Sequence, residues 1–450
     1  MAKIMKVKAP SLFKLACDQQ RTDAATSAAA RLRDATAGQG SAQAVLAFLG
    51  TKGKSSDIPT IASLRKESET VAKPENLLGG RARRYKMLRQ SAYLLQDEAV
   101  NGCCHRMADM NQIGEVQVVY REATKGVGFR GVQTCGSVWH CPVCANKIAE
   151  TRRAELATGM ALHQAMGGKV YMMTLTFPHT IAMDLRECIE GQRKALKLFK
   201  ESAAFKRFRK VSGYKGGVRA LEVTHGENGW HPHTHELLFC NSHEEYVLNE
   251  LEALRDYWGK AVKKAGLGQI NAHGFDVAGA DAAADYVTKF GNIENQTQNA
   301  WTVSHEMTRQ HMKVARKKGR TPFALLFDSM QGDSKAARLF IEYAKEFKGK
   351  RQLYYSPGLK DYLGLEEVLD AEIAAQDEQD AEGEAPQKVL YTLTYNEWKL
   401  LCRFNMRGEL LDVAANHGTE GIYLFIKALK LRDSGKALTA EVLIDPATKF

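Results

Sequence analysis

The sequence contains no uninterrupted apolar run of the length that a membrane helix requires. A bilayer-spanning helix needs roughly 18 to 20 consecutive apolar residues, and no stretch of the 450 residues approaches that length. The N-terminal segment SLFKLAC is interrupted by Lys14 and is not followed by the pattern of a cleaved secretory signal. We therefore expect a cytoplasmic protein with no membrane partner.

Cysteine is also too sparse and too clustered for a disulfide framework. The chain has nine cysteines, an odd number, and five of them lie within residues 103–144. Such grouping is typical of metal binding in a reducing compartment.

The apolar fraction of 44% is that of a globular protein with a real core, and the length allows two or three domains.

Acidic residues are far fewer than basic ones in two long segments. Residues 191–220 contain ten Lys/Arg and one acid, a net charge of +9, and residues 301–360 contain thirteen Lys/Arg and five acids, a net charge of +8. The whole chain has a formal charge of +11, which favours a polyanionic partner, nucleic acid first. Residues 361–385 reverse the sign, with ten Asp/Glu and no Lys/Arg, as in a solvated linker.

The apolar pattern changes several times along the chain. Residues 1–80 hold few large apolar side chains, and we expect them to be flexible or weakly helical. Helical spacing begins near residue 81, strands are expected within 115–135 and 169–179, and residues 216–240 predict a β-hairpin. Residues beyond 386 regain helical periodicity.

A group of cysteines has the spacing of a zinc site. The segment TCGSVWHCPVC carries Cys135, Cys141 and Cys144 in a C-x5-C-x2-C array, and a two-residue turn brings two sulfurs to one ion. The fourth ligand comes from NGCCHR upstream or from His140; we favour Cys104, with Cys103 next. Four protein ligands predict a structural Zn²⁺, while reduced cysteines in a core are the alternative.

Three histidines alternate within the second half of the predicted hairpin. In the segment WHPHTHELLFC, His231, His233 and His235 recur at every second position, so a strand points all three the same way. His233, His235 and Glu222 of the partner strand predict a site for Mg²⁺ or Mn²⁺ with positions open to phosphate oxygens. The register is not fixed by the sequence, so His231 or His225 remains open as the third ligand.

A third segment, GADAAADYVTKFGNIEN, predicts a short helix. Asp281 can cap a helix that displays Tyr286, with Lys289 and Phe290 one turn further on. The three alanines before Tyr286 leave room for a strand of nucleic acid to approach it. Alone, Tyr286 reads as an ordinary half-buried aromatic residue and Lys289 as an exposed lysine.

Together these segments resemble a known family. MMTLTFPH, WHPHTH and YVTKF, in that order and after the cysteine array, are similar to the rolling-circle replication initiators (Rep proteins) of bacterial plasmids, in the HUH endonuclease superfamily. The resemblance covers roughly residues 100–360. It implies that His233 and His235 bind the catalytic metal and that Tyr286 is the nucleophile. Thr234 departs mildly from the family, which usually has a bulky apolar residue there.

The resemblance implies a site-specific, metal-dependent nickase and strand transferase. Tyr286 would form a 5′-phosphotyrosine link to single-stranded origin DNA and release a 3′-OH that primes a host polymerase, with a host helicase as further partner. Lys289 would contact phosphate or lower the pKa of the phenol. No second tyrosine or glutamate lies one turn from Tyr286, so termination is unassigned, with Asp281, Asp285 and Glu294 as candidates.

Two rival functions remain open at this point. One is an HUH single-strand DNA transposase, and the other is a zinc protein that binds nucleic acid without catalysis. The expected fold is α+β, with an HUH-like antiparallel sheet and flanking helices. The expected parts are an N-terminal region (1–80), a zinc-binding segment (81–165), the HUH endonuclease domain (166–360), an acidic linker (361–385) and a small helical C-terminal module (386–450).

Overall fold

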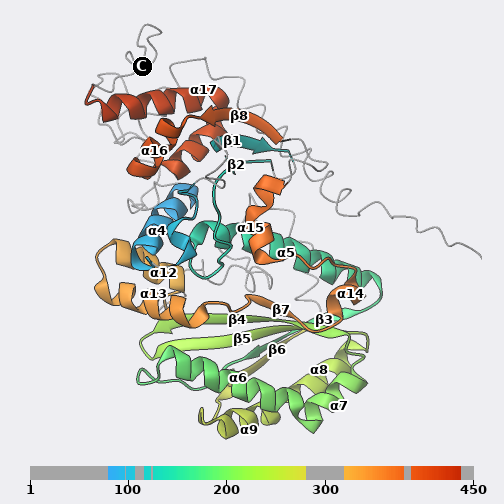
Figure 1. Cartoon of the computed structure of the whole chain (residues 1–450). Coiled ribbons are helices and arrows are strands. Elements are labelled where there is room, and N and C mark those ends of the chain that lie inside the picture. The colour runs from blue at the N-terminus through green and yellow to red at the C-terminus, as the bar shows by residue number, and fades with distance from the viewer. Residues whose placement is uncertain are drawn as a thin grey trace, which may run out of the picture.

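The structure is a computed structural model, which describes residues 80–96, 98–106, 116–122, 125–279, 319–379 and 387–436. Within these residues the fold is mixed α/β with two antiparallel sheets, as the sequence predicted at this coarse level (Figure 1). The predicted flexible N-terminal region lies outside the described residues. None of the described helices has both the length and the hydropathy needed to cross a bilayer.

The larger sheet has five strands in the order β6-β3-β5-β4-β7, and every pair is antiparallel. Its strands are β3 (Lys169–Leu175), β4 (Gly216–Gly226), β5 (Gly229–Cys240), β6 (Phe275–Ala278) and β7 (Leu353–Tyr355). The strand β5, which carries the alternating histidines, is the central one. It is therefore held by backbone hydrogen bonds on both sides, which fixes the direction of its side chains.

Helices cover both faces of this sheet (Figure 1). One face packs against α6 (Leu185–Glu201), α7 (Ala203–Val211), α8 (Glu244–Glu252) and α9 (Arg255–Ala265). The other packs against α5 (Pro142–Ala165) and α14 (Leu359–Leu363), through Leu156 and Met160 on Val170, Leu237 and Phe239. The α5 side is called the upper face below, and the α6 side the lower face.

Helix α6 illustrates how the sequence forms these elements. Asp184 and Glu187 make a capping box that satisfies the free N–H groups at the helix start. Buried residues then recur at three- and four-residue spacing, so one stripe faces the sheet. The predicted basic helical stretch 191–220 is thus the end of α6, all of α7 and the start of β4.

The smaller sheet joins distant parts of the chain, in the order β2-β1-β8. Strands β1 (Val116–Arg121) and β2 (Gly126–Arg130) come from the predicted zinc segment, and β8 (Gln387–Leu393) comes from the C-terminal module. Helices α4 (Gly80–Leu94), α16 (Tyr395–Phe404) and α17 (Arg407–Asp433) pack with it. We call these six elements, with the cysteines between them, the cysteine lobe.

Three further helices connect the cysteine lobe to the large sheet. Helices α12 (Pro322–Met330) and α13 (Ser334–Phe347) lie between α4 and the hairpin, as Figure 1 shows. Within the segment predicted to be an acidic linker, α15 (Asp370–Gln379) buries Ile373 and Ala374, and Arg152 of α5 bonds Asp370 at 2.8 Å. One acidic residue of this segment, Asp370, thus helps α15 dock on α5.

Candidate functional site

The predicted hairpin is present and its register is now defined. Strands β4 and β5 are joined by the two residues Glu227 and Asn228, and Gly226 pairs with Gly229. Gly229 has a φ of +87°, and a Cβ there would lie 2.9 Å from the Cα of Ile181. Glycine is needed at this position for both reasons.

The register brings Glu222 directly opposite His233, and Ala220 opposite His235. Because side chains alternate along a strand, Glu222, His233 and His235 all point to the upper face. Glu222 and His235 are buried, and His233 is 14% exposed. The sequence predicted this grouping, and the hairpin register now supplies the reason for it.

Both imidazoles converge on one carboxylate oxygen. Nε2 of His233 and Nε2 of His235 each lie 3.0 Å from the same Oε2 of Glu222. One ligand atom from each of the three residues lies within 4.8 Å of the others. The three side chains thus form a compact set of two nitrogen donors and one oxygen donor.

The opposite nitrogen of each ring is also held. Nδ1 of His233 lies 3.3 Å from the carbonyl oxygen of His231, and Nδ1 of His235 lies 3.0 Å from Oγ1 of Thr174. A carbonyl oxygen only accepts, so Nδ1 of His233 carries a proton. The neutral ring then turns a lone pair on Nε2 toward the Glu222 oxygen, which is favourable only with a cation or a second proton between them.

This arrangement fits a divalent cation. Histidine ligands usually donate their second N–H to an outer partner, which fixes the tautomer and the ring orientation. Two imidazoles and one carboxylate leave further positions open, which suits Mg²⁺, Mn²⁺ or another transition metal. Thr174 was not singled out from the sequence, although it lies in the quoted segment MMTLTFPH.

The two alternative third ligands are not among the three converging side chains, although the His231 ring lies beside that of His233, with centroids 5.1 Å apart. His225 points away from the group and packs edge-on against Trp230 with ring centroids 4.9 Å apart. His231 stacks on His179 at 4.5 Å, and burial lowers its pKa to about 3, with His233 and His179 adding to the effect. Its ring is therefore neutral, and its main part in the group is the carbonyl oxygen that orients His233.

Thr234 points to the opposite, lower face. It is fully buried, and its Oγ1 accepts a hydrogen bond of 3.0 Å from the side-chain amide of Gln192 in α6. Gln192 thus gives the hydroxyl of Thr234 a hydrogen-bond partner, at a position where the family usually has an apolar residue. The departure from the family pattern has a local packing reason.

The cysteine group is assembled from three places in the chain. Cys103 comes from a turn after α4, Cys135 precedes α5, and Cys141 and Cys144 lie at the start of α5. The sequence favoured Cys104 as the fourth member, but it is the sulfur of Cys103 that lies in the group. Cys104 has a φ of +48°, which turns its side chain toward Tyr85 and Cys402.

The sulfur distances fit a tetrahedral site. Cys103 Sγ lies 3.6 Å from Cys141 Sγ and 3.5 Å from Cys144 Sγ, and the Cys135 to Cys144 distance is 3.8 Å. Four sulfurs bound about 2.3 Å from one zinc ion would lie roughly 3.8 Å apart. Hydrogen bonding with Cys103 holds the pKa of Cys144 well below that of a free thiol. The group therefore suits a soft, thiolate-binding metal such as Zn²⁺.

His140, the other open choice, is used elsewhere. Its Nε2 lies 2.9 Å from the carbonyl oxygen of Ala344 in α13. Cys141 instead acts as the N-cap of α5, accepting from the backbone N–H of Cys144 at 3.3 Å. The helix start thus aims two sulfurs at one point.

The predicted nucleophile Tyr286, Lys289 and the termination candidates Asp281, Asp285 and Glu294 lie outside the described residues. The same holds for most of the basic segment 301–320. Arg320, which is described, bonds Asp328 at 3.0 Å and Asp333 at 2.9 Å. Its charge is therefore balanced within the fold.

Two comparisons with known proteins agree with the family resemblance seen in the sequence. Residues 128–265 match the model of a family described as "Replication protein". The chain is 26% identical over 363 residues to "Protein rep" of Streptomyces lividans, covering 65% of this chain and 76% of that protein. The resemblance to plasmid Rep proteins is confirmed. The family match contains Glu222, His233 and His235, and three of the four grouped cysteines.

A second relative matches a shorter part of the chain. It is the "Neomycin resistance protein" of Streptomyces cyanogenus, 30% identical over 154 residues, which are 28% of this chain and 35% of that protein. No solved structure matches the chain significantly. The Rep relationship therefore rests on sequence, and the geometry above adds the arrangement of the site.

Proposed function

We propose that this Rep relative initiates rolling-circle replication by nicking one DNA strand at an origin. The observation that carries the proposal is the convergence of His233 and His235 on Glu222, at 3.0 Å each, in the centre of an antiparallel sheet. This is the arrangement that the HUH resemblance implies for a nickase. A divalent cation held there would supply charge stabilisation to the oxygens of the scissile phosphate.

In the proposed reaction, Tyr286 attacks the phosphate. A bond forms between its phenolic oxygen and phosphorus, the bond from phosphorus to the 3′ oxygen breaks, and the phenol proton ends on that oxygen as a 3′-OH. Glu222, His233 and His235 would hold a phosphate-activating ion, and Thr174 and the His231 carbonyl keep the two rings oriented. Lys289 would contact the phosphate.

The sheet geometry allows Tyr286 to reach this site. Ala278, the last residue of β6, lies opposite Met172, and Met172 lies opposite Leu237, two residues from His235. With strands about 4.8 Å apart and a rise of about 3.4 Å per residue, Ala278 and His235 are roughly 12 Å apart. Tyr286 is eight positions after Ala278 in the chain, and such a segment can span up to about 27 Å.

The test is covalent trapping of DNA. Wild-type protein, Mg²⁺ or Mn²⁺ and labelled single-stranded oligonucleotides that tile the replicon's origin should give a labelled protein band under denaturing conditions. Tyr286→Phe should give no band yet bind the same DNA, because only the nucleophilic oxygen is removed. Tyr246→Phe, the same change at an exposed tyrosine of α8, is the control. An adduct that survives in Tyr286→Phe rejects this nucleophile.

The same experiment separates the rival functions. A zinc protein without catalysis would bind the oligonucleotides and give no adduct with any divalent cation. A single-strand transposase would form the adduct with the ends of a mobile element and not with an origin. The proposed initiator requires the origin to be the better substrate.

A further inference from the structure

A group of cations without ion-pair partners among the described residues lies on the side of the sheet away from Glu222, His233 and His235. Helices α6 and α9 lie side by side on the lower face, as Figure 1 shows. Phe199 of α6 meets Trp258 of α9 with ring centroids 5.6 Å apart, and a Cβ at Gly191 would touch Leu267, just after α9. Position 199 thus pairs with 258 and position 191 with 267, so the two helices are antiparallel.

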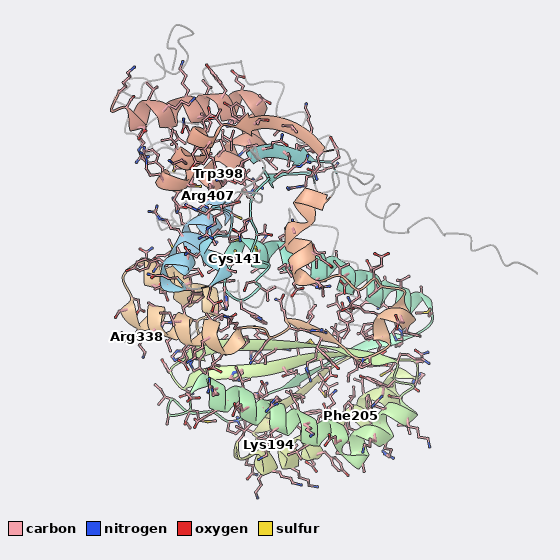
Figure 2. All side chains as sticks on the ribbon, in the orientation of Figure 1. Cys141, Lys194, Phe205, Arg338, Trp398 and Arg407 are labelled. Carbon is pink, nitrogen blue, oxygen red and sulfur yellow. The ribbon has the colours of Figure 1, made fainter. Side chains whose placement is uncertain are left out.

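This antiparallel packing gathers cations from two distant segments. The exposed Lys/Arg residues of the two facing stretches are Arg193, Lys194, Lys197, Lys260, Lys263 and Lys264. We call these six residues the α6–α9 basic face. Neither stretch, residues 191–200 nor residues 259–267, contains an acidic residue. Figure 2 shows Lys194 on this side of the molecule, below the large sheet and far from Cys141.

Ion pairs with described residues do not neutralise the six charges of this face. None of them forms an ion pair with another described residue, whereas Arg186 and Arg207 nearby bond Glu346 and Glu250. Arg193 with Lys197 and Lys260 with Lys264 are like-charged pairs four residues apart, which destabilise a helix by a few tenths of a kcal/mol each. Lys260 contacts the ring of Tyr257, and Lys263 and Lys264 lie in the last turn of α9, where the helix dipole favours cations. No contact of this kind offsets the repulsion between Arg193 and Lys197 within the described residues.

The sheet separates this face from the metal-binding residues. Gln192 and Lys200 of α6 contact Thr234 and Glu236, which point to the lower face, while His233 and His235 point to the upper face. A phosphate at Glu222 and a phosphate on the α6–α9 basic face therefore lie on opposite sides of β5. One short nucleotide segment cannot occupy both.

We propose that the α6–α9 basic face binds the backbone of a second DNA segment, a duplex, while the upper face holds the strand to be cut. The choice of DNA rests on the proposed function. A duplex is favoured because sites for single strands combine cations with aromatic rings for base stacking. On α6 and α9, which the structure describes completely, the only exposed ring is Tyr257, and Lys260 lies over it at 5.1 Å.

The experiment measures duplex binding as a function of salt, with no divalent cation added. A 30-base-pair fluorescent duplex of arbitrary sequence is titrated with wild-type protein and with the triple variant Arg193→Gln, Lys197→Gln, Lys263→Gln. The logarithm of the binding constant falls as the logarithm of the salt concentration rises. Loss of three phosphate contacts should make this negative slope less steep by roughly 2 to 3. The matched control is Lys335→Gln, Arg338→Gln, Lys345→Gln, three exposed cations of α13 with the same change of charge.

Three results would overturn the inference: an unchanged slope in the α6–α9 variant, an equal loss in the α13 control, or a loss seen with single strands and not with the duplex. Because no cleavage is involved, the result does not depend on Tyr286. Failure of the wild-type protein to form a DNA adduct would reject the proposed nicking and leave the duplex measurement intact.

Discussion

At the scale of single residues, the two histidines proposed to bind the catalytic cation make the clearest prediction. We expect the double variant His233→Ala, His235→Ala to form the adduct more slowly than wild type by on the order of a hundredfold or more. Without the charge of the metal, the activation free energy should rise by about 3 kcal/mol or more. DNA binding should persist, because phosphate contacts by Lys and Arg supply most of it. Adduct formation is measured in Mg²⁺ or Mn²⁺.

The matched control changes two exposed histidines, His243→Ala just before α8 and His273→Ala in a short 3-10 helix. Glu222→Ala should behave as the double histidine variant does, because the same oxygen faces both rings. Nicking at the wild-type rate by the double histidine variant would show that the three side chains serve only to fill the sheet.

The adjacent cysteines offer a second comparison at the residue scale. We expect Cys103→Ser to lose the metal and most of the thermal stability, because only its sulfur lies with Cys135, Cys141 and Cys144. Cys104→Ser should retain about one Zn²⁺ per chain, since four ligands complete the site without it. Elemental analysis after dialysis measures the zinc content of each variant. Equal zinc content in the two variants would exclude Cys103 as the fourth ligand.

At the scale of elements, α16 depends on one carboxylate. Burial alone raises the pKa of Glu397, but hydrogen bonds from Lys430 and from the Thr394 backbone outweigh it and bring the pKa below its usual value of 4.5. The unfolded chain therefore takes up this proton at a higher pH than the folded chain. The stability that Glu397 contributes is complete above about pH 4.5 and declines as the pH falls through its native pKa.

Substitution makes this testable. Glu397→Gln should lower the free energy of unfolding by about 1 to 3 kcal/mol at neutral pH, because Lys430 and the helix start lose a charged partner. Its stability should also vary less with pH between about 5 and 3 than that of the wild type. Denaturant titrations at each pH measure both effects, and parallel pH profiles for the two proteins would contradict the assignment.

Sequence reasoning succeeded where the pattern is local. The alternation of His231, His233 and His235 predicted a strand, and the glycines around Asn228 predicted the turn, because both signals lie within a few residues. The grouping of His233, His235 and Glu222 followed from a hairpin, the simplest way to pair two neighbouring strands. The acid on the partner strand could be named because its distance from the turn is short.

It failed where the answer depends on backbone direction or on distant segments. Cys103 and Cys104 are indistinguishable in sequence, and the choice depends on the positive φ of Cys104. Thr174 reaches His235 only because β3 pairs with β5 in one particular register. The pairing of β8 with β1 joins residues about 270 positions apart, which no local period encodes.

At the scale of the whole molecule, the C-terminal module and the zinc segment are one unit. Trp398 donates to the carbonyl oxygen of His105 at 3.1 Å, Arg407 donates to that of Cys104, and the rings of Phe129 and Trp398 meet with centroids 5.2 Å apart. These contacts surround the turn that carries Cys103. The module therefore supports the metal site directly.

This union predicts the behaviour of a cut chain. A specific protease site inserted between Gln379 and Gln387 should allow cleavage into two fragments that still elute together from gel filtration without denaturant. The reason is that β8 is hydrogen-bonded along β1 and α17 packs on α4. A C-terminal fragment that elutes alone would show that the two parts fold independently. The control is the same protein with the inserted site but without protease, which shows how the insertion alone affects elution.

The position of β8 also has a consequence during synthesis. Strand β1 has β2 on one side as soon as residue 130 is made, but its other edge waits for residues 387–393. At roughly 5 to 20 residues per second, the ribosome needs some 13 to 50 seconds to supply them. For that time the growing chain presents an open strand edge, which can pair with other chains. We expect nascent chains stalled before residue 387 to aggregate and to be captured by chaperones, and chains released after residue 436 to escape both.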